Sequence, residues 1–166
     1  LNIRRPDLAV AQLKAALERK PENIPIRLSL AGLIAQAGGR NAEQALKEYD
    51  SILEIEPENV FALLGKASLL ARQGQYDQAE AICQKILVRD SGNAQALLIL
   101  ADSQLRRGNP AGAQETYGIF ARLHRDQPQG HRGEAFCQLI RGDIEAAVQT
   151  IENARALLPG NLDLQF

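Results

Sequence analysis

Residues 60–93 read VFALLGKASLLARQGQYDQAEAICQKILVRDSGN, and positions within this stretch recur along the whole chain. One series of glycines is Gly38, Gly74, Gly108 and Gly142. Two series of alanines accompany it: Ala31, Ala67, Ala101 and Ala135, and Ala9, Ala45, Ala79, Ala113 and Ala147. Neighbouring members lie 34 residues apart, except for one interval of 36 in each series. Three series with one period indicate an internal repeat with a two-residue insertion between Gly38 and Ala45.

Each repeat is predicted to contain two helices. In residues 60–93 apolar residues lie at helical spacing in both halves, so each half carries one apolar stripe. The glycines predict helix ends, because Gly adopts the left-handed backbone found there. Asparagine side chains predict N-caps at Asn23, Asn59, Asn93 and Asn161. The predicted helices cover residues 7–20, 25–37, 42–55, 59–73, 76–89, 94–107, 111–124, 129–141 and 144–157.

This pattern resembles the tetratricopeptide repeat (TPR) family, whose unit is a helix–turn–helix of 34 residues. The residues that carry the resemblance are Ala67, Gly74, Tyr76, Ala79, Cys83, Ile86 and Leu87. The resemblance implies an all-α fold, a right-handed superhelix of stacked units. Its predicted parts are a half repeat (1–23), four repeats (24–59, 60–93, 94–127 and 128–161) and the start of a truncated helix (162–166). The last repeat departs most from the family, with Glu134 and Gln138 at positions that are usually apolar.

Composition disfavours several classes of binding protein. The 166 residues carry 19 Lys and Arg against 20 Asp and Glu, a net charge of −1. A dedicated nucleic-acid binder needs a basic excess, so no nucleic-acid partner is expected. The apolar runs are too short to span a bilayer, so no direct membrane insertion is expected.

Catalytic, metal and cofactor sites are not predicted. His124 and His131 lie on either side of a turn near Pro128, without further ligands at metal-binding spacing. Cys83 and Cys137 are expected to be small core residues. The segment from Gly130 to Gly133 lacks the Lys-Ser/Thr end of a phosphate loop and is interpreted as an irregular helix start. The chain is therefore expected not to be an enzyme.

The expected binding surface follows from the resemblance. In the family the first helix of each unit lines a concave groove, and the matching positions here mix large apolar side chains with arginines. Contiguous exposed apolar surface of this kind marks partner sites, and the arginines suit carboxylates. For Leu64, burial between helices is an equal alternative. The predicted groove residues are Phe61, Leu64, Arg72, Leu98, Asp102, Leu105, Arg106, Arg132, Phe136, Leu139 and Ile140.

Two specialised grooves of the family do not match. The carboxylate clamp of chaperone-tail binders would need Lys, Asn and Arg where this chain has Leu28, Gly32, Gly65, Gln95 and Ile99. The asparagine ladder of sugar-transferring enzymes would need Asn where this chain has Ser29, Gly65, Ile99 and Gly133.

The leading hypothesis is a non-catalytic scaffold that binds a peptide or partner protein in the groove. The Ala-, Gln- and Leu-rich composition is similar to that of bacterial TPR proteins of envelope or exopolysaccharide-export assemblies. The expected location is therefore the cytoplasm or the periplasm of a bacterium. One alternative is a regulatory or substrate-recruiting arm of a larger enzyme. Another is an array that forms homo-oligomers through its uncapped ends.

The alanine series predicts that a larger side chain at a helix crossing lowers the stability of the fold. A methyl group lets two helices approach closely, so Ala79→Leu should overpack the crossing and lower the free energy of unfolding by about 1–3 kcal/mol. Chemical unfolding followed by circular dichroism measures this loss. An unchanged stability would show that Ala79 is not at a close crossing.

Overall fold

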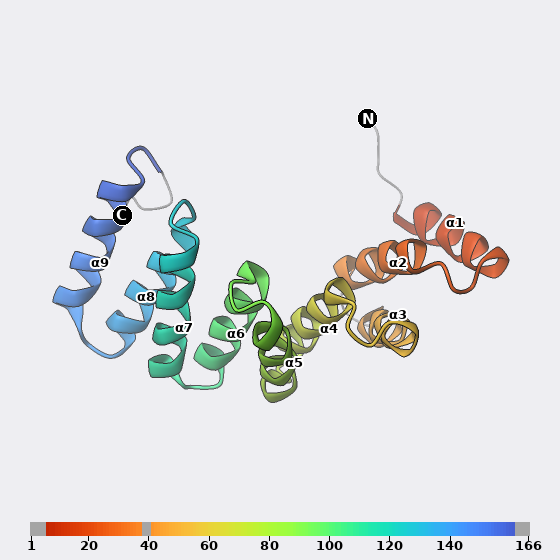
Figure 1. The fold of residues 1–166 in the computed structure, drawn as a ribbon, viewed down its shortest axis with the longest axis horizontal. Helices are drawn as coiled ribbons and strands as arrows, with labels where there is room; N and C mark the ends of the chain where they lie inside the picture. The colour runs from red at the N-terminus through yellow and green to blue at the C-terminus, as the bar shows by residue number, and fades with distance from the viewer. Residues whose placement is uncertain (1–5, 38–40, 162–166) are drawn as a thin grey trace. The chain divides into compact units, whose positions relative to one another are not determined.

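The computed structural model describes residues 6–37 and 41–161. All the regular structure in these residues is helical, and no strand occurs among them. The helices are α1 (Pro6–Arg19), α2 (Ile24–Ala37), α3 (Ala42–Ile55), α4 (Val60–Arg72), α5 (Tyr76–Arg89), α6 (Ala94–Arg106), α7 (Pro110–Leu123), α8 (Pro128–Ile140) and α9 (Ile144–Leu157) (Figure 1). Each lies within two residues of its predicted bounds at both ends, which confirms the all-α fold. The predicted helix that starts at 162 lies outside the described residues.

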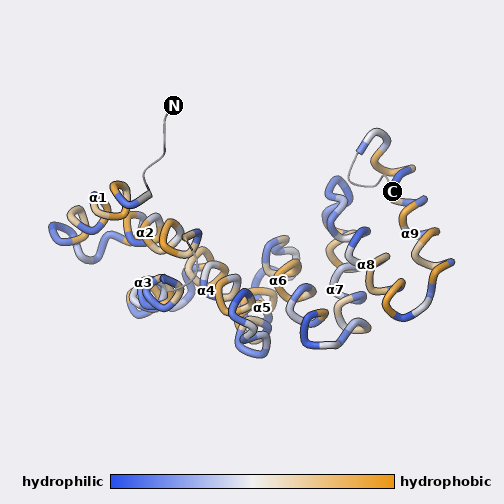
Figure 2. The backbone as a smooth tube through the Cα atoms, turned by 180° about the vertical axis from the view of Figure 1, so that it is seen from behind, coloured by the Kyte–Doolittle hydropathy of each residue, from blue (hydrophilic) through white to orange (hydrophobic). Residues whose placement is uncertain are grey.

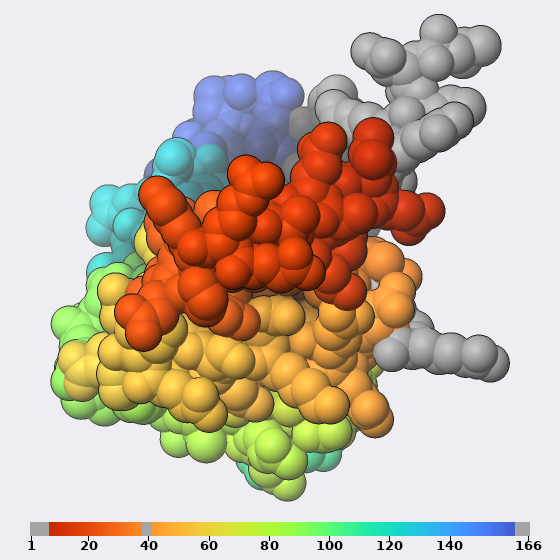
Figure 3. Space-filling model, turned by 90° about the vertical axis from the view of Figure 1, so that its right-hand side faces the viewer, coloured from red at the N-terminus to blue at the C-terminus, as the bar shows by residue number. Residues whose placement is uncertain are grey.

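The chain forms two compact units, Leu1–Arg72 and Gln73–Phe166. In the first unit α1 packs on α2, and α2 packs on both α3 and α4. Figure 3 shows these helices, red through amber, in direct contact with one another. In the second unit α5 to α9 pack in sequence, each against the next. The division between the units falls inside the predicted repeat 60–93, between its two helices.

Asparagine caps begin several of the helices. The side-chain Oδ1 of Asn93 accepts a hydrogen bond from the backbone N–H of Ala96 at 3.0 Å. Asn59 and Asn23 do the same at α4 and α2, at 3.0 and 3.1 Å. These contacts confirm the three caps, each worth about 1 kcal/mol. The structure adds Asn109, which accepts from Gly112 N–H at 3.0 Å and starts α7.

Glycines follow the ends of helices, as the repeat predicts. Gly74, Gly108 and Gly142 have φ angles of 79°, 85° and 84°. This left-handed backbone is costly for any residue with a Cβ, so the series is fixed by conformation. Gly38, the fourth member, lies outside the described residues.

Small residues line the contacts between the helices. The two alanine series from residue 31 onward are buried almost completely: Ala31, Ala45, Ala67, Ala79, Ala101, Ala113, Ala135 and Ala147. Polar and apolar stretches alternate along the helices in Figure 2, and the apolar faces supply the larger core side chains. Cys83 and Cys137 are both free and buried, which confirms that they are small core residues.

Two glycines inside helices make room for tyrosine rings. A Cβ added to Gly65 on α4 would lie 2.4 Å from the ring of Tyr49 on α3. In the second unit a Cβ on Gly133 of α8 would lie 2.4 Å from the ring of Tyr117 on α7. The intervening repeat reverses the sizes, with Cys83 on α5 and Ile99 on α6 at the equivalent positions. Large and small side chains therefore alternate between partner helices, which keeps the packing dense.

In the last repeat, a polar residue at a usually apolar position has a hydrogen-bond partner on the next helix. Gln138 of α8 is buried and accepts a hydrogen bond from the Thr150 hydroxyl of α9 at 3.0 Å. One repeat earlier, Gln104 of α6 accepts from Thr116 of α7 at 2.8 Å. A buried polar group costs little when it is hydrogen-bonded, so Gln138 is accommodated at a position that is usually apolar.

Gly130 corrects one expectation. The segment from Gly130 to Gly133 is not an irregular helix start, because α8 runs regularly from Pro128. The glycine is needed for close approach instead: an added Cβ would lie 2.7 Å from the backbone N of Ala121 on α7.

Substitution of this glycine tests the close approach. Gly130→Ala should lower the free energy of unfolding by about 1–3 kcal/mol, because the backbone of α7 would have to move. Gly32→Ala is the matched control, since its Cβ would meet nothing within 4 Å and alanine favours a helix by about 0.5–1 kcal/mol. Thermal and chemical unfolding compare the two. Equal effects of the same sign would contradict the packing of α7 on α8.

Candidate partner-binding surface

A hollow of about 590 Å³ opens on the second unit between α6, α7 and α8. Its size is that of a typical ligand or side-chain pocket. Helices α6 and α8 supply most of its walls, and α7 and α9 each supply one residue. The residues that line it are Leu98, Asp102, Leu105, Tyr117, Gln129, Arg132, Gly133, Ala135, Phe136, Leu139 and Ile151.

Phe136 and Leu139 line the hollow from α8, and Ile140 extends the same exposed apolar stripe outside the lining. Phe136, Leu139 and Ile140 are 53 %, 45 % and 51 % exposed, respectively. Leu98 and Leu105 of α6 face the same hollow and are partly buried. Exposed large side chains beside a cavity are uncommon on a surface that contacts only water, so this stripe is the feature of the second unit best suited to a partner.

Tyr117 and Asp102 form the polar part of the hollow. The Tyr117 ring extends from α7 over Gly133, and its hydroxyl donates a hydrogen bond to the carboxylate of Asp102 on α6. Burial is the main cause that raises the pKa of Tyr117, followed by the hydrogen bond to Asp102 and its charge; Arg106 opposes them. The tyrosine therefore stays neutral and acts as a donor that fixes Asp102.

Tyr117 is not among the predicted groove residues, because the prediction places the groove on the first helix of each unit. The signal that could have found it is the pairing of sizes between adjacent helices. Tyr49 and Tyr117 are equivalent in the repeat, and so are Gly65 and Gly133. A glycine at this position of the repeat therefore marks where a tyrosine ring from the preceding helix packs against the backbone.

The second unit carries two unpaired arginines at this surface. Arg132 of α8 lines the hollow, and Arg106 of α6 is near enough to lower the pKa of Tyr117. Neither takes part in an ion pair within residues 6–37 and 41–161. Both side chains are exposed, so their charges are available to a partner.

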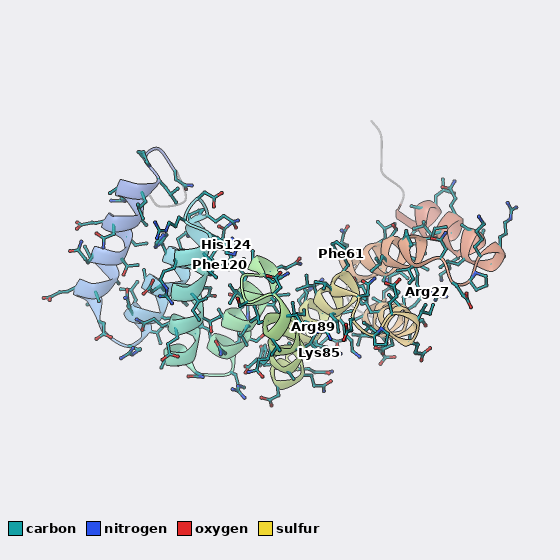
Figure 4. The ribbon with its side chains drawn as sticks, viewed as in Figure 1. Arg27, Phe61, Lys85, Arg89, Phe120 and His124 are labelled. Carbon is teal, nitrogen blue, oxygen red and sulfur yellow. The ribbon has the colours of Figure 1, made fainter. Side chains whose placement is uncertain are left out.

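Three residues of the predicted groove, Phe61, Leu64 and Arg72, lie on α4 in the first unit. Phe61 is 74 % exposed and projects from the helix (Figure 4). Leu64 is only 5 % exposed, so of its two alternatives burial between helices is the one that holds, and it offers no accessible wall. An apolar stripe on a helix serves the core before it serves a surface.

Arg72, which is predicted to face a partner, is hydrogen-bonded within the first unit. Its Nη1 donates to the backbone carbonyl of Ala35 at 3.0 Å. Ala35 lies in the last turn of α2, where carbonyls lack partners within the helix. The guanidinium therefore caps a neighbouring helix of the first unit and is already engaged.

The structure thus brings most of the predicted groove residues together in one place. Arg106 and Ile140 lie on the same helices as the hollow-lining residues, and Phe61, Leu64 and Arg72 belong to the first unit. The predicted residues that line the hollow itself are Leu98, Asp102, Leu105, Arg132, Phe136 and Leu139.

His124 and Cys83 pack against other groups of the fold and are not part of the hollow. The ring of His124 lies 4.7 Å from that of Phe120 (Figure 4), and its Nε2 is 2.8 Å from the carbonyl oxygen of Gly92. Burial, with a smaller effect of Glu80, raises the pKa of the Cys83 thiol to about 12. Within the described part of the chain no group of three or more His, Cys, Asp and Glu is placed to hold a metal ion.

The sequence of the chain matches the model of a known repeat family. The family model described as tetratricopeptide repeat matches residues 37–90 and 70–135, more than half of the chain. The chain belongs to the tetratricopeptide repeat family. A comparison with curated proteins finds no significant match.

Solved structures share the TPR fold of the chain at low sequence identity. MamA (41-end) from Desulfovibrio magneticus RS-1 superposes with a TM-score of 0.83 at 17 % identity, over 93 % of this chain and 86 % of that one. A tetratricopeptide repeat protein from Parabacteroides merdae ATCC 43184 gives 0.79 at 20 %, over 93 % and 61 %. MamA AMB-1 gives 0.70 at 17 %, over 93 % and 98 %. The helical repeat fold is that of protein-interaction scaffolds, which are generally non-catalytic.

None of the helices in residues 6–37 and 41–161 has the length and apolar character needed to cross a bilayer.

A double-mutant cycle tests the pair at the base of the hollow. Tyr117→Phe removes one hydroxyl and Asp102→Ala removes its acceptor, and their coupling energy in chemical unfolding should be about 1 kcal/mol. Tyr76→Phe is the control, with an expected loss close to zero. Additive effects of the Tyr117 and Asp102 changes would show that the hydrogen bond contributes nothing.

Proposed function

We propose that this TPR chain is a non-catalytic scaffold that binds a peptide or a segment of a partner protein at the hollow of its second unit. The observation that carries the proposal is the exposed stripe of Phe136, Leu139 and Ile140 beside a hollow whose lining includes polar side chains. Burial of such side chains stabilises a complex by roughly 25 cal/mol for each Å² removed from water.

The distribution of charge supports a protein partner. The net charge of −1 gives no long-range attraction to a polyanion. The hollow mixes apolar walls with a few polar groups, which is the composition of sites that select a particular side chain. The titratable groups at its base are the paired Asp102 and Tyr117, and the raised pKa of Tyr117 makes it a poor base.

The narrower assignment to an envelope or exopolysaccharide-export assembly stays a prediction, as do the alternatives of an enzyme's recruiting arm and of a self-associating array. A partner segment in the hollow is compatible with the first two. Self-association through the ends of the array would leave the hollow free, so the alternatives predict different effects of substitutions there.

Peptide selection with a matched pair of variants tests the proposal. Short random peptides displayed on phage are selected on the chain, and the enriched peptides are synthesised for fluorescence anisotropy. Phe136→Asp should weaken their binding at least about tenfold, a loss of about 1.4 kcal/mol. Val88→Asp is the control, because Val88 is 86 % exposed on α5 and does not line the hollow.

Both variants should melt like the parent chain, since both side chains are exposed. If no peptide is enriched, or if the enriched peptides bind the Phe136 and Val88 variants equally, the hollow is not the binding site and the proposal fails.

A further inference from the structure

The hollow of the second unit is electrically asymmetric. Arg132 lies on its α8 wall, near the start of that helix, and has no ion-pair partner in the described residues. The other charged group that lines it, Asp102 on α6, already accepts the Tyr117 hydroxyl. Arg132 therefore has no ion-pair partner among the described residues, whereas Asp102 keeps its negative charge and accepts one hydrogen bond from a neutral hydroxyl.

Arg106 adds a second, weaker positive influence. It is one helical turn beyond Asp102 on α6, so the carboxylate of Asp102 partly balances it. Arg106 is exposed and does not line the hollow, but its charge lowers the pKa of Tyr117, which does. By contrast, Arg132 is on the opposite wall and has no acidic neighbour among the lining residues other than Asp102.

Apolar side chains surround the position of Arg132. Phe136 lies one turn further along α8 on the same face, and Leu139 follows on the next turn. A side chain seated against Phe136 would exclude water from one side of the guanidinium. An arginine–carboxylate contact strengthens as water is excluded and often forms two parallel hydrogen bonds.

We propose that the partner segment carries a large apolar side chain that enters the hollow and, next to it, a carboxylate that pairs with Arg132. This inference rests on the proposed function and names the chemistry of its partner, an acidic and apolar peptide. A basic segment is disfavoured because it would have to approach two arginines, Arg132 and Arg106, against the single carboxylate of Asp102. Gln129, one turn before Gly133 and also in the lining, can donate a further hydrogen bond to the same carboxylate.

Charge reversal at Arg132 tests this pairing. The probes are the synthetic peptides enriched on the parent chain, and the measurement is their dissociation constant by fluorescence anisotropy. The enriched sequences should contain Asp or Glu beside a large apolar residue. Arg132→Glu should weaken binding by about tenfold or more, and Arg132→Gln by a smaller factor, as expected for a hydrogen bond to a charged group.

Two controls separate this effect from loss of folding or of general attraction. Arg125→Glu makes the same charge change at an exposed residue after α7 that does not line the hollow, and should leave the affinity within about twofold. A peptide whose acidic residue is replaced by lysine should bind Arg132→Glu more tightly than it binds the parent chain. Arg106→Glu should have an effect intermediate between those of Arg132→Glu and Arg125→Glu.

The outcomes distinguish this inference from the function beneath it. Binding that depends on Phe136 but is unchanged by Arg132→Glu, or enriched peptides that are basic, would overturn the carboxylate pairing and leave the hollow as the site. Binding that is insensitive to Phe136, or the absence of enriched peptides, would overturn both.

Discussion

The close approach of neighbouring helices is the constraint on which the rest of the structure depends. Two helices can pack at the short end of the usual range only where small side chains meet, and the repeat supplies alanine or glycine at those crossings. At Gly130 the spacing leaves no room for a single Cβ beside the backbone of α7. Within each unit, buried alanines or glycines recur where successive helices pack.

This constraint also shapes the candidate site. Where a glycine on one helix meets a tyrosine on the preceding helix, the tyrosine ring lies over the glycine. In the second unit this brings the Tyr117 hydroxyl to Asp102 and makes the base of the hollow polar, whereas Phe136 and Leu139 keep its wall apolar. The candidate surface therefore combines a polar pair, fixed by the packing of the helices, with an exposed apolar wall.

Much of the fold could be predicted from the sequence because its signals are local. Helix bounds follow from apolar spacing, and the caps at Asn59 and Asn93 depend on residues three positions apart. Most residues of the hollow followed from their position in the repeat. Two predicted groove residues have other surroundings in the structure. Leu64 is buried in the core, and Arg72 donates a hydrogen bond to a carbonyl of another helix. Such long-range partners leave no periodic signal, and the role of Tyr117 required comparing residue sizes on two helices.

The most direct test of the packing account is a proton NMR measurement on Gly133. The ring of Tyr117 lies against its α-carbon, so the account predicts strong nuclear Overhauser effects between the Tyr117 ring protons and the Gly133 α-protons, with those α-protons shifted by the ring current. Gly32, which meets nothing within 4 Å of an added Cβ, should show no such effect. Gly133 α-protons at ordinary shifts and without contacts to Tyr117 would contradict the account.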